Sequence, residues 1–494
     1  MERCPPVNFP FFSNQQPTTS NSSPSMPHTS QNDKAQLLTG GPVLRAIASI
    51  AIPMALVMVV NAVFSYLDLW FIARLGPDAL HAMDVLFPYI SLSNALVYAG
   101  LGTGVSVVVA RQATRGGASW EGVLKAGLVL AIPLSLIFVL GAVCGKDVLL
   151  RALGTDASRA MAGIYSFWYF LFFPIMAFGA VISSAMRGTG HALRPALYSV
   201  GCIVLKAVLT PLLSYESVGL GWGIQGAAVS TVIAYSLLLL LLVGDLYRGK
   251  QGLRVCKFTA SPDRQVYQRI VRSGIVAAQV PVLASVVLLL VLDVMSARSV
   301  QMADAFSLAK RFELYLIQLT VCLGCGTMVV MSASLEASHA SRVWSAMRSS
   351  LKVLFTAGLP LVVGMSLFSD VFYRSLTTDS AIIQEGHKYF TYGGLHMMFT
   401  LGIILLNFGF QGIGRPFRAL PYLVFSIVLV QGGGSWLLRS DLLDSSVYYV
   451  FISAGSALAF LMALRVLRRM VLDEDTNPAM VPALTAAEVR GQAV

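Results

Sequence analysis

The sequence predicts an all-α integral membrane protein with twelve transmembrane helices in two pseudo-symmetric six-helix lobes. Its composition, its long apolar runs and an internal repeat lead to this fold class. The 494 residues are 56% hydrophobic and 12% charged, with a mean hydropathy of +0.71. Soluble domains carry about twice that fraction of charge. A β-barrel would show alternating segments of about ten residues, whereas these apolar runs are continuous.

Twelve apolar runs are long enough to cross a bilayer as helices. They cover residues 43–73, 80–110, 121–144, 159–186, 192–214, 221–246, 267–297, 301–332, 346–369, 382–411, 416–438 and 446–470. Turn-forming residues separate them, as in Gly76-Pro77-Asp78. Pro53 lies inside the first run, so we predict a kink and a hinge there.

The two halves of the chain resemble each other. At an offset of 224, segment 188–205 is identical to 412–429 at eight of eighteen positions, and at an offset of 225 Leu67-Asp68 falls on Leu292-Asp293. The identities are Gly188/Gly412, Gly190/Gly414, Arg194/Arg418, Tyr198/Tyr422, Val200/Val424, Ile203/Ile427, Val204/Val428 and Leu205/Leu429. Parallel repeats of this kind are typical of transporters, with a binding cavity between the lobes.

The net charge of +11 comes from Lys and Arg between the spans. This placement indicates that the basic loops lie against the lipid bilayer, and it excludes nucleic acid as a binding partner. Loops after even-numbered spans are more basic than the others, so we predict that both termini lie in the cytoplasm. The predicted location is the inner (cytoplasmic) membrane of the cell. The predicted segments are a disordered tail 1–42, a lobe 43–247, a basic linker 248–266, a second lobe 267–470 and a tail 471–494.

Two opposite charges lie inside different apolar runs, Asp68 in the first and Lys206 in the fifth. A charge at membrane depth costs several kcal/mol unless it has a partner, so each is a functional candidate. At 1.5 Å per helical residue, Asp68 lies about 9 Å and Lys206 about 12 Å from the outer ends of their spans. We therefore predict an ion pair, with Thr210 one turn from Lys206 and Thr231 at a similar depth. The pair is either a proton-sensitive coupling site or a permanent structural bridge.

Several motifs resemble those of the multidrug and toxic compound extrusion family, the MATE transporters. Asp68 is followed by a Gly-containing turn and Ala-Leu-His-Ala, Leu101-Gly-Thr-Gly104 precedes Ala110-Arg111, and Arg187-Gly-Thr-Gly190 precedes Pro195. Gly226-Ala-Ala-Val-Ser-Thr231 and Phe410-Gln-Gly-Ile-Gly-Arg415 continue the likeness. The resemblance covers about 43–470 and implies secondary active transport of xenobiotics or other small compounds.

The chain departs from prokaryotic relatives that carry the first-span aspartate. Those relatives usually offer Asn and Asp in the fifth span, before a proline, where this chain has Lys206 and Thr210 before Pro211. Carboxylate and amide oxygens suit sodium, whereas an ammonium group only donates and is itself positive. Proton coupling is therefore predicted in preference to sodium coupling.

Other polar residues are candidates for the substrate cavity: Asn61, Asn94, Asp293, Lys310, Arg311 and Glu313. Lys310 and Glu313 are three residues apart, so they either pair on one helix face or line the cavity. If Lys310 and Arg311 line it, an anionic substrate becomes plausible. Asp293 is either an interfacial charge or a counterpart of Asp68, and Asp84 is expected to be solvated.

The prediction is a proton-coupled antiporter that exports small organic compounds. The alternative is a flippase for a lipid-linked or anionic metabolite from the same superfamily. The sequence contains no P-loop and no catalytic constellation, so an enzyme is not expected. No cofactor and no metal site are predicted either, because Cys322-x-x-Cys325 lies in an apolar run without a second pair or a His.

Overall fold

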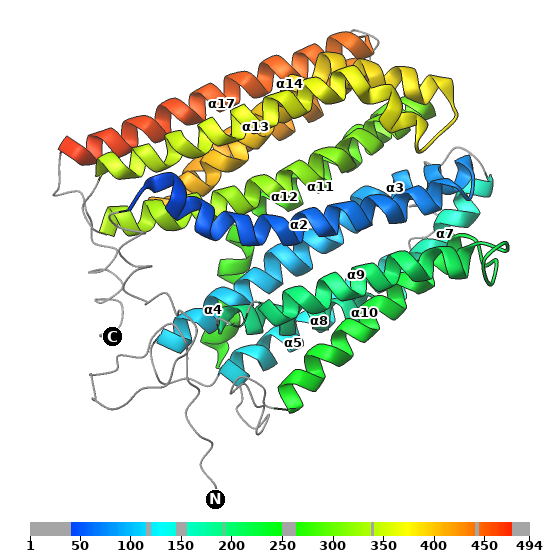
Figure 1. Cartoon of the computed structure of the whole chain (residues 1–494), viewed down its shortest axis with the longest axis horizontal. Coiled ribbons are helices and arrows are strands. Elements are labelled where there is room, and N and C mark those ends of the chain that lie inside the picture. The colour runs from blue at the N-terminus through cyan, green and yellow to red at the C-terminus, as the bar shows by residue number, and fades with distance from the viewer. Residues whose placement is uncertain are drawn as a thin grey trace, which may run out of the picture.

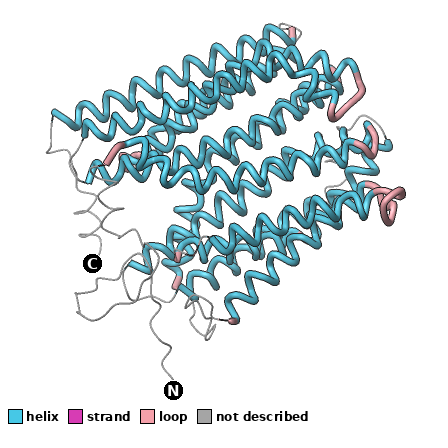
Figure 2. The backbone as a smooth tube through the Cα atoms, viewed as in Figure 1, coloured by secondary structure: helices cyan, strands magenta, loops and turns pink. Residues whose placement is uncertain are grey.

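The computed structural model describes residues 41–114, 120–144, 156–189, 191, 193–248, 263–336, 340–439 and 444–476. Over these residues the chain is helical and contains no β-strand (Figure 2). The tails 1–42 and 471–494 and the linker 248–266 lie largely outside the described residues, except that the last helix continues to Thr476. The long apolar runs and the all-helical prediction are confirmed.

Six spans precede the linker region. Their helices are α2 (Val43–Ala73), α3 (Pro77–Asn94), the π-helical η1 (Ala95–Gly102), α4 (Thr103–Thr114), α5 (Trp120–Cys144), α7 (Asp156–Leu171), α8 (Phe173–Gly188), α9 (Leu193–Ser214) and α10 (Ile224–Tyr247). The elements α3, η1 and α4 follow one another directly and form the second span, Pro77–Ala110.

Six further spans follow the linker region. Their helices are α11 (Arg264–Arg298), α12 (Val300–Glu336), α13 (Ala340–Arg374), α14 (Ser380–Gly412), η3 (Pro416–Ala419), α15 (Leu420–Val424), the π-helical η4 (Phe425–Gly432), α16 (Gly433–Arg439) and α17 (Ser445–Thr476). The elements from η3 to α16 form one span, Pro416–Arg439.

The fourth span, predicted over 159–186, is broken into two helices. The axes of α7 and α8 differ by 46° across Phe172. Pro174 lies in the first turn of α8, where it has no N–H to donate and its ring disfavours a continuous helix. With this bent pair taken as one span, the described residues contain the twelve predicted spans.

The helices form two bundles with separate hydrophobic cores (Figure 1). The first helix of each bundle also packs across to the other. Ala46 and Ile47 of α2 belong to the core of the second lobe, and Ile270 of α11 belongs to the core of the first. This reciprocal packing agrees with the predicted pseudo-symmetry.

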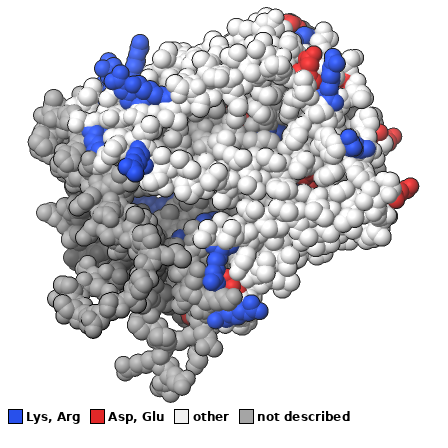
Figure 3. Space-filling model, in the orientation of Figure 1, with Lys and Arg blue, Asp and Glu red and all other residues white. Residues whose placement is uncertain are grey.

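The bundle has two ends, which we name by the chain. The terminal face is the end where α2 begins and α17 ends, and the opposite face is the end where α2 ends and α3 begins (Figure 1). In Figure 3 most of the visible Lys and Arg side chains lie toward the terminal face, and most of the visible Asp and Glu lie toward the opposite face. The distribution follows the bias that predicted cytoplasmic termini.

Candidate functional site

Asp68 and Lys206 meet inside the first lobe. The Lys206 Nζ donates to Asp68 Oδ2 at 2.7 Å, and the two side chains are only 19% and 13% exposed. Asp68 comes from α2 and Lys206 from α9, which are separated by 138 residues of chain. The predicted pair is therefore present, and it joins α2 to α9.

Thr210 completes the coordination of Asp68. Its hydroxyl lies 2.9 Å from Asp68 Oδ1 and also 2.9 Å from the Lys206 carbonyl, one turn earlier on α9. The hydroxyl of Ser230 on α10 lies 2.9 Å from Thr210 Oγ1. Ser230 thus extends the site to a third helix.

Ser230 was missed in the sequence, where its neighbour Thr231 was selected. The Thr231 hydroxyl donates to the Ala227 carbonyl of its own helix at 3.0 Å. Both residues have the right depth, and only the rotation of α10 about its axis decides which hydroxyl faces Thr210. That rotation depends on packing and cannot be obtained from spacing.

The two asparagines predicted near this site differ in their contacts. Asn94 accepts a hydrogen bond from the Tyr169 hydroxyl at 3.4 Å. The Asn61 Oδ1 is buried and has no hydrogen-bond partner among the described residues. Pro53 lies on α2 with its side chain exposed, and α2 remains a single helix through it.

The second lobe contains its own Lys–carboxylate pair. Lys310 Nζ donates to Glu313 Oε2 at 2.6 Å, within α12, and the side chains are 11% and 3% exposed. Lys310 also lies 3.2 Å from His396 Nε2 on α14. Because an ammonium only donates, Nε2 accepts and Nδ1 carries the proton, which is donated to Ser456 Oγ of α17 at 2.7 Å. Lys310 and Glu313 therefore pair on one face of α12.

Arg311 faces away from this pair and contacts the first lobe. Its Nη2 lies 3.1 Å from Asp84 Oδ1 and donates to the Met83 carbonyl, and its guanidinium stacks over the Phe87 ring at 4.5 Å. Asp84 is 2% exposed, so the expectation that it is solvated was wrong. Asp84 lies in the middle of α3, where Ser307 and Arg311 of α12 cover it.

Asp293, which the repeat relates to Asp68, lies in a different environment. Its side chain is exposed at the edge of a pocket between α3, α11 and α12. Among the described residues no group of three or more His, Cys, Asp or Glu side chains could hold a metal ion. In the described part of the chain, ion pairs with a largely buried carboxylate lie within the first lobe at Asp68–Lys206 and Arg194–Asp245, within the second lobe at Lys310–Glu313, and between the lobes at Arg311–Asp84.

Comparisons with known proteins agree with this architecture. The model of the MatE family matches residues 53–212 and 279–433. A curated relative, the "FAD transporter" of Shewanella oneidensis, is 22% identical over 404 residues, which cover 80% of this chain and 87% of the relative.

Solved structures show the same fold. A multidrug resistance MATE family transporter of the MOP superfamily, in an inward-facing conformation, superposes with a TM-score of 0.75 at 20% identity, covering 87% of this chain and 99% of the other. A MOP superfamily transporter from Pyrococcus furiosus, described as having a binding pocket of reverse polarity that suggests a different function, gives 0.73 at 22% identity, with 90% and 99% covered.

The family match spans more than half of the chain, and the two solved structures superpose on it over 99% of their own lengths. The chain therefore belongs to the MatE family of multi-pass membrane transporters, and it is not an enzyme.

Proposed function

We propose that this transporter exports small organic compounds by alternating access and that inward movement of protons drives the export. The contact between Asp68 and Lys206 is the observation that carries the proposal. It places a titratable carboxylate at membrane depth between two helices of one lobe. We place the protein in the inner membrane of the cell, with its terminal face toward the cytoplasm. The distribution of Lys and Arg supports this orientation.

Protonation of Asp68 is the proposed coupling step. A neutral Asp68 no longer attracts the Lys206 ammonium, so the link between α2 and α9 weakens. Pro53 lies on α2 at a point where the backbone hydrogen-bond ladder already lacks one N–H, so bending there costs less than elsewhere. Release of α2 from α9 would then change the shape of the first lobe and the side of the membrane to which the substrate is exposed.

Lys206 also determines which ion can be used. Its ammonium occupies one carboxylate oxygen of Asp68, and the Thr210 hydroxyl occupies the other. A sodium ion would have to displace a group of the same charge from the same oxygen. A proton needs no such space, which supports proton coupling over sodium coupling.

The test is Lys206→Asn in proteoliposomes, with transport driven in turn by a proton gradient and by a sodium gradient. We expect proton-driven transport to shift to higher pH, because the carboxylate loses the ammonium that stabilises its ionised form. The matched control is Lys352→Asn, which removes an exposed lysine of α13. Unchanged coupling in Lys206→Asn would instead assign the pair a purely structural role.

A second candidate substrate class is an anionic metabolite, including a lipid-linked one. The similarity to a flavin dinucleotide transporter favours it, and Lys310 and Arg311 lie in the second lobe near the lobe interface. Both cations are already paired, so such a substrate would compete with Glu313 or Asp84 for them. A panel of lipophilic cations, flavin dinucleotide and other nucleotides in the same proteoliposomes distinguishes the two classes.

A further inference from the structure

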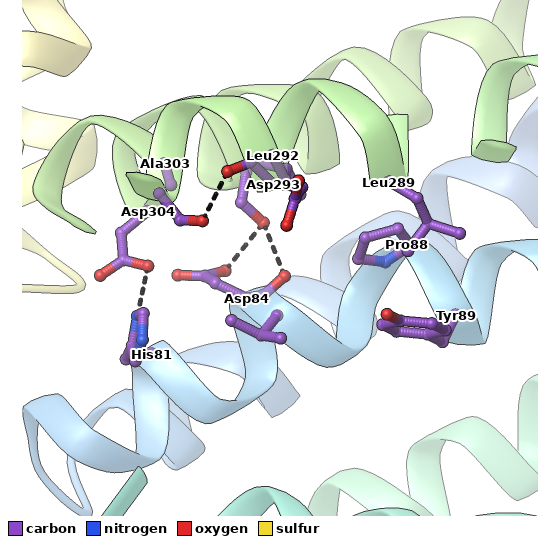
Figure 4. A pocket seen from close by; sticks show the side chains of 12 residues that line it. His81, Asp84, Pro88, Tyr89, Leu289, Leu292, Asp293, Ala303 and Asp304 are labelled. Carbon is purple, nitrogen blue, oxygen red and sulfur yellow. Dashed lines mark hydrogen bonds and ion pairs between the residues drawn. The ribbon is translucent and has the colours of Figure 1, made fainter. Parts of the chain in front are cut away.

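A pocket lies between the two lobes near the opposite face (Figure 4). The space between its walls is about 480 Å³, a volume that includes the solvent at its open side. The walls come from α3 of the first lobe and from α11 and α12 of the second. The polar groups on these walls include two acids and a histidine that are buried: His81, Asp84 and Asp304, which are 7%, 2% and 6% exposed. None of these three belongs to the proposed coupling site.

Two polar contacts, a histidine–aspartate contact and an arginine–aspartate ion pair, cross from lobe to lobe at this pocket. The His81 Nδ1 lies 2.6 Å from Asp304 Oδ1, and the Arg311 Nη2 lies 3.1 Å from Asp84 Oδ1. The Ser307 hydroxyl adds a hydrogen bond to Asp84 at 3.2 Å. We call His81, Asp84, Asp304 and Arg311 the interlobe latch. Opening the opposite face requires that α3 separate from α12, which breaks both pairs.

The lobes contact each other differently toward the terminal face. There Gly104 of α4 lies so close to α11 that a side chain would collide with the Ile270 backbone, and Gly326 of α12 is similarly close to Ile47 of α2. These contacts are made by backbone and small apolar groups and carry no charge. The lobes therefore meet through uncharged groups at these positions near the terminal face and through the ionisable groups of the latch at the opposite face.

The charges of the latch do not balance without a proton. Asp84 and Asp304 carry two negative charges and Arg311 carries one positive charge, so a neutral His81 leaves the buried cluster with a net charge of −1. An uncompensated buried charge is costly. One proton on His81 makes the latch neutral and gives Asp304 a cationic partner.

The surroundings also favour a proton. Burial of the His81 ring opposes a charge on it, but the further ionisable groups around the latch include three acids, Asp78 on α3, Asp293 on α11 and Asp379 before α14. The tyrosines Tyr89 of α3 and Tyr373 of α13 are uncharged. Lys310, next to Arg311 on α12, is paired with Glu313.

Two latch atoms lack a hydrogen-bond partner among the described residues. They are Asp84 Oδ2 and His81 Nε2, and both are buried. In Figure 4 the Asp84 carboxylate and the His81 ring project from the same side of α3, and the free oxygen of Asp84 points toward the His81–Asp304 pair. The unpartnered Asp84 oxygen thus adds negative charge beside the His81–Asp304 pair, which favours a proton there.

We propose that His81 is a proton-binding site of the closed latch, distinct from Asp68. With both ring nitrogens protonated, Nδ1 donates to Asp304 while the positive charge offsets Asp84. When the lobes separate at the opposite face, His81 loses Asp304 and reaches water, where imidazole releases its proton near neutral pH. Acid on that side therefore closes the latch. The inference rests on alternating access but not on the substrate or on Asp68.

The experiment measures the separation of the lobes as a function of pH. Spin labels are placed on exposed loops at the opposite face, at Ser217→Cys between α9 and α10 and at Thr378→Cys between α13 and α14, in a chain whose six native cysteines are replaced. Distances are recorded by electron paramagnetic resonance in nanodiscs, without substrate or gradient. Between about pH 8 and pH 5, the range in which histidine titrates, we expect the closed-to-open ratio to rise by about tenfold.

Variants separate His81 from other titrating groups. In His81→Gln, and independently in Asp304→Asn, the ratio should no longer depend on pH, whereas His387→Gln should behave as the wild type. His387 is the matched control because it is exposed and contacts Ser369 and Asp370 within the second lobe. A pH-independent wild type, or a pH response that survives in His81→Gln, overturns the proposal.

One further variant keeps this result separate from the proposed coupling step. Asp68→Asn should lose proton-driven transport yet keep the pH response of the spin-label distance. Loss of that response in Asp68→Asn, with His81→Gln unaffected, would assign the pH dependence to Asp68 and overturn the role of His81. Retained proton-driven transport in Asp68→Asn would contradict the coupling step alone.

Discussion

The two lobes each bury a lysine and a carboxylate, but they connect them differently. In the first lobe Asp68 and Lys206 belong to separate helices, α2 and α9. In the second lobe Lys310 and Glu313 are three residues apart on α12, and the link to α14 passes through His396. Loss of the first pair therefore frees one helix from another, whereas loss of the second leaves α12 intact. In the proposed mechanism the first pair, which joins two helices, is the one that converts a protonation into a movement.

The largest effect is expected from removal of the first-lobe carboxylate. Asp68→Asn leaves the Lys206 ammonium buried without its counter-charge, which costs about 3–5 kcal/mol, and an amide does not bind the transported proton. Proton-driven transport should be lost and thermal stability lowered. The double variant Asp68→Asn/Lys206→Gln should recover part of the stability and none of the proton drive.

Proteoliposome transport and thermal unfolding in detergent measure the two effects. Asp444→Asn is the control, because it removes an exposed aspartate just before α17. Proton-driven transport by Asp68→Asn at the wild-type rate would show that the first-lobe pair is only structural.

Removal of the second-lobe carboxylate should separate stability from coupling. Glu313→Gln leaves Lys310 with neutral His396 as a partner, so the free energy of unfolding should fall by about 3 kcal/mol. The number of protons moved per substrate should stay the same, because this pair does not join α2 to α9. Reversal-potential measurements give that number, and thermal unfolding gives the stability.

A matched control lies on α14. Glu385 pairs with Lys388 at the same spacing and at the same 2.6 Å, but these side chains are 20% and 33% exposed. Glu385→Gln should cost less than about 1 kcal/mol. If Glu313→Gln changed the proton number while its stability matched that of Glu385→Gln, the contrast between the lobes would be wrong.

Span number and the depths of Asp68 and Lys206 were accessible from the sequence because residue spacing fixes both. The contact itself was predicted from their matching depth and opposite charge. Hydropathy gives the spans, and the rise per residue gives the depth of each charge. The latch was not accessible. Asp84 and Arg311 belong to different lobes, and their contact depends on how the lobes pack, so Asp84 was expected to be solvated.

The remaining differences have the same origin. Pro174 could have indicated the break between α7 and α8, but prolines such as Pro133 lie inside other spans without dividing them into separate helices. Ser230 and Thr231 have nearly equal depth, and only the rotation of α10 chose between them. Depth along the membrane is a one-dimensional property of the sequence, whereas lobe contacts and helix rotation require the folded chain.

The smallest effect is expected from the hydroxyl beside Asp68. Thr210→Val keeps the shape of the side chain and removes the hydrogen bond to Asp68 Oδ1, which should lower stability by about 1–2 kcal/mol. Proton-driven transport should persist and move to slightly higher pH, because a bond to the ionised carboxylate is lost. The control is Thr356→Val on α13, an exposed threonine whose hydroxyl contacts only its own helix backbone. A larger pH shift in Thr210→Val than in Lys206→Asn would mean that the hydroxyl, rather than the ammonium, sets the charge state of Asp68, and the difference between the lobes would then lie in Thr210 and Ser230.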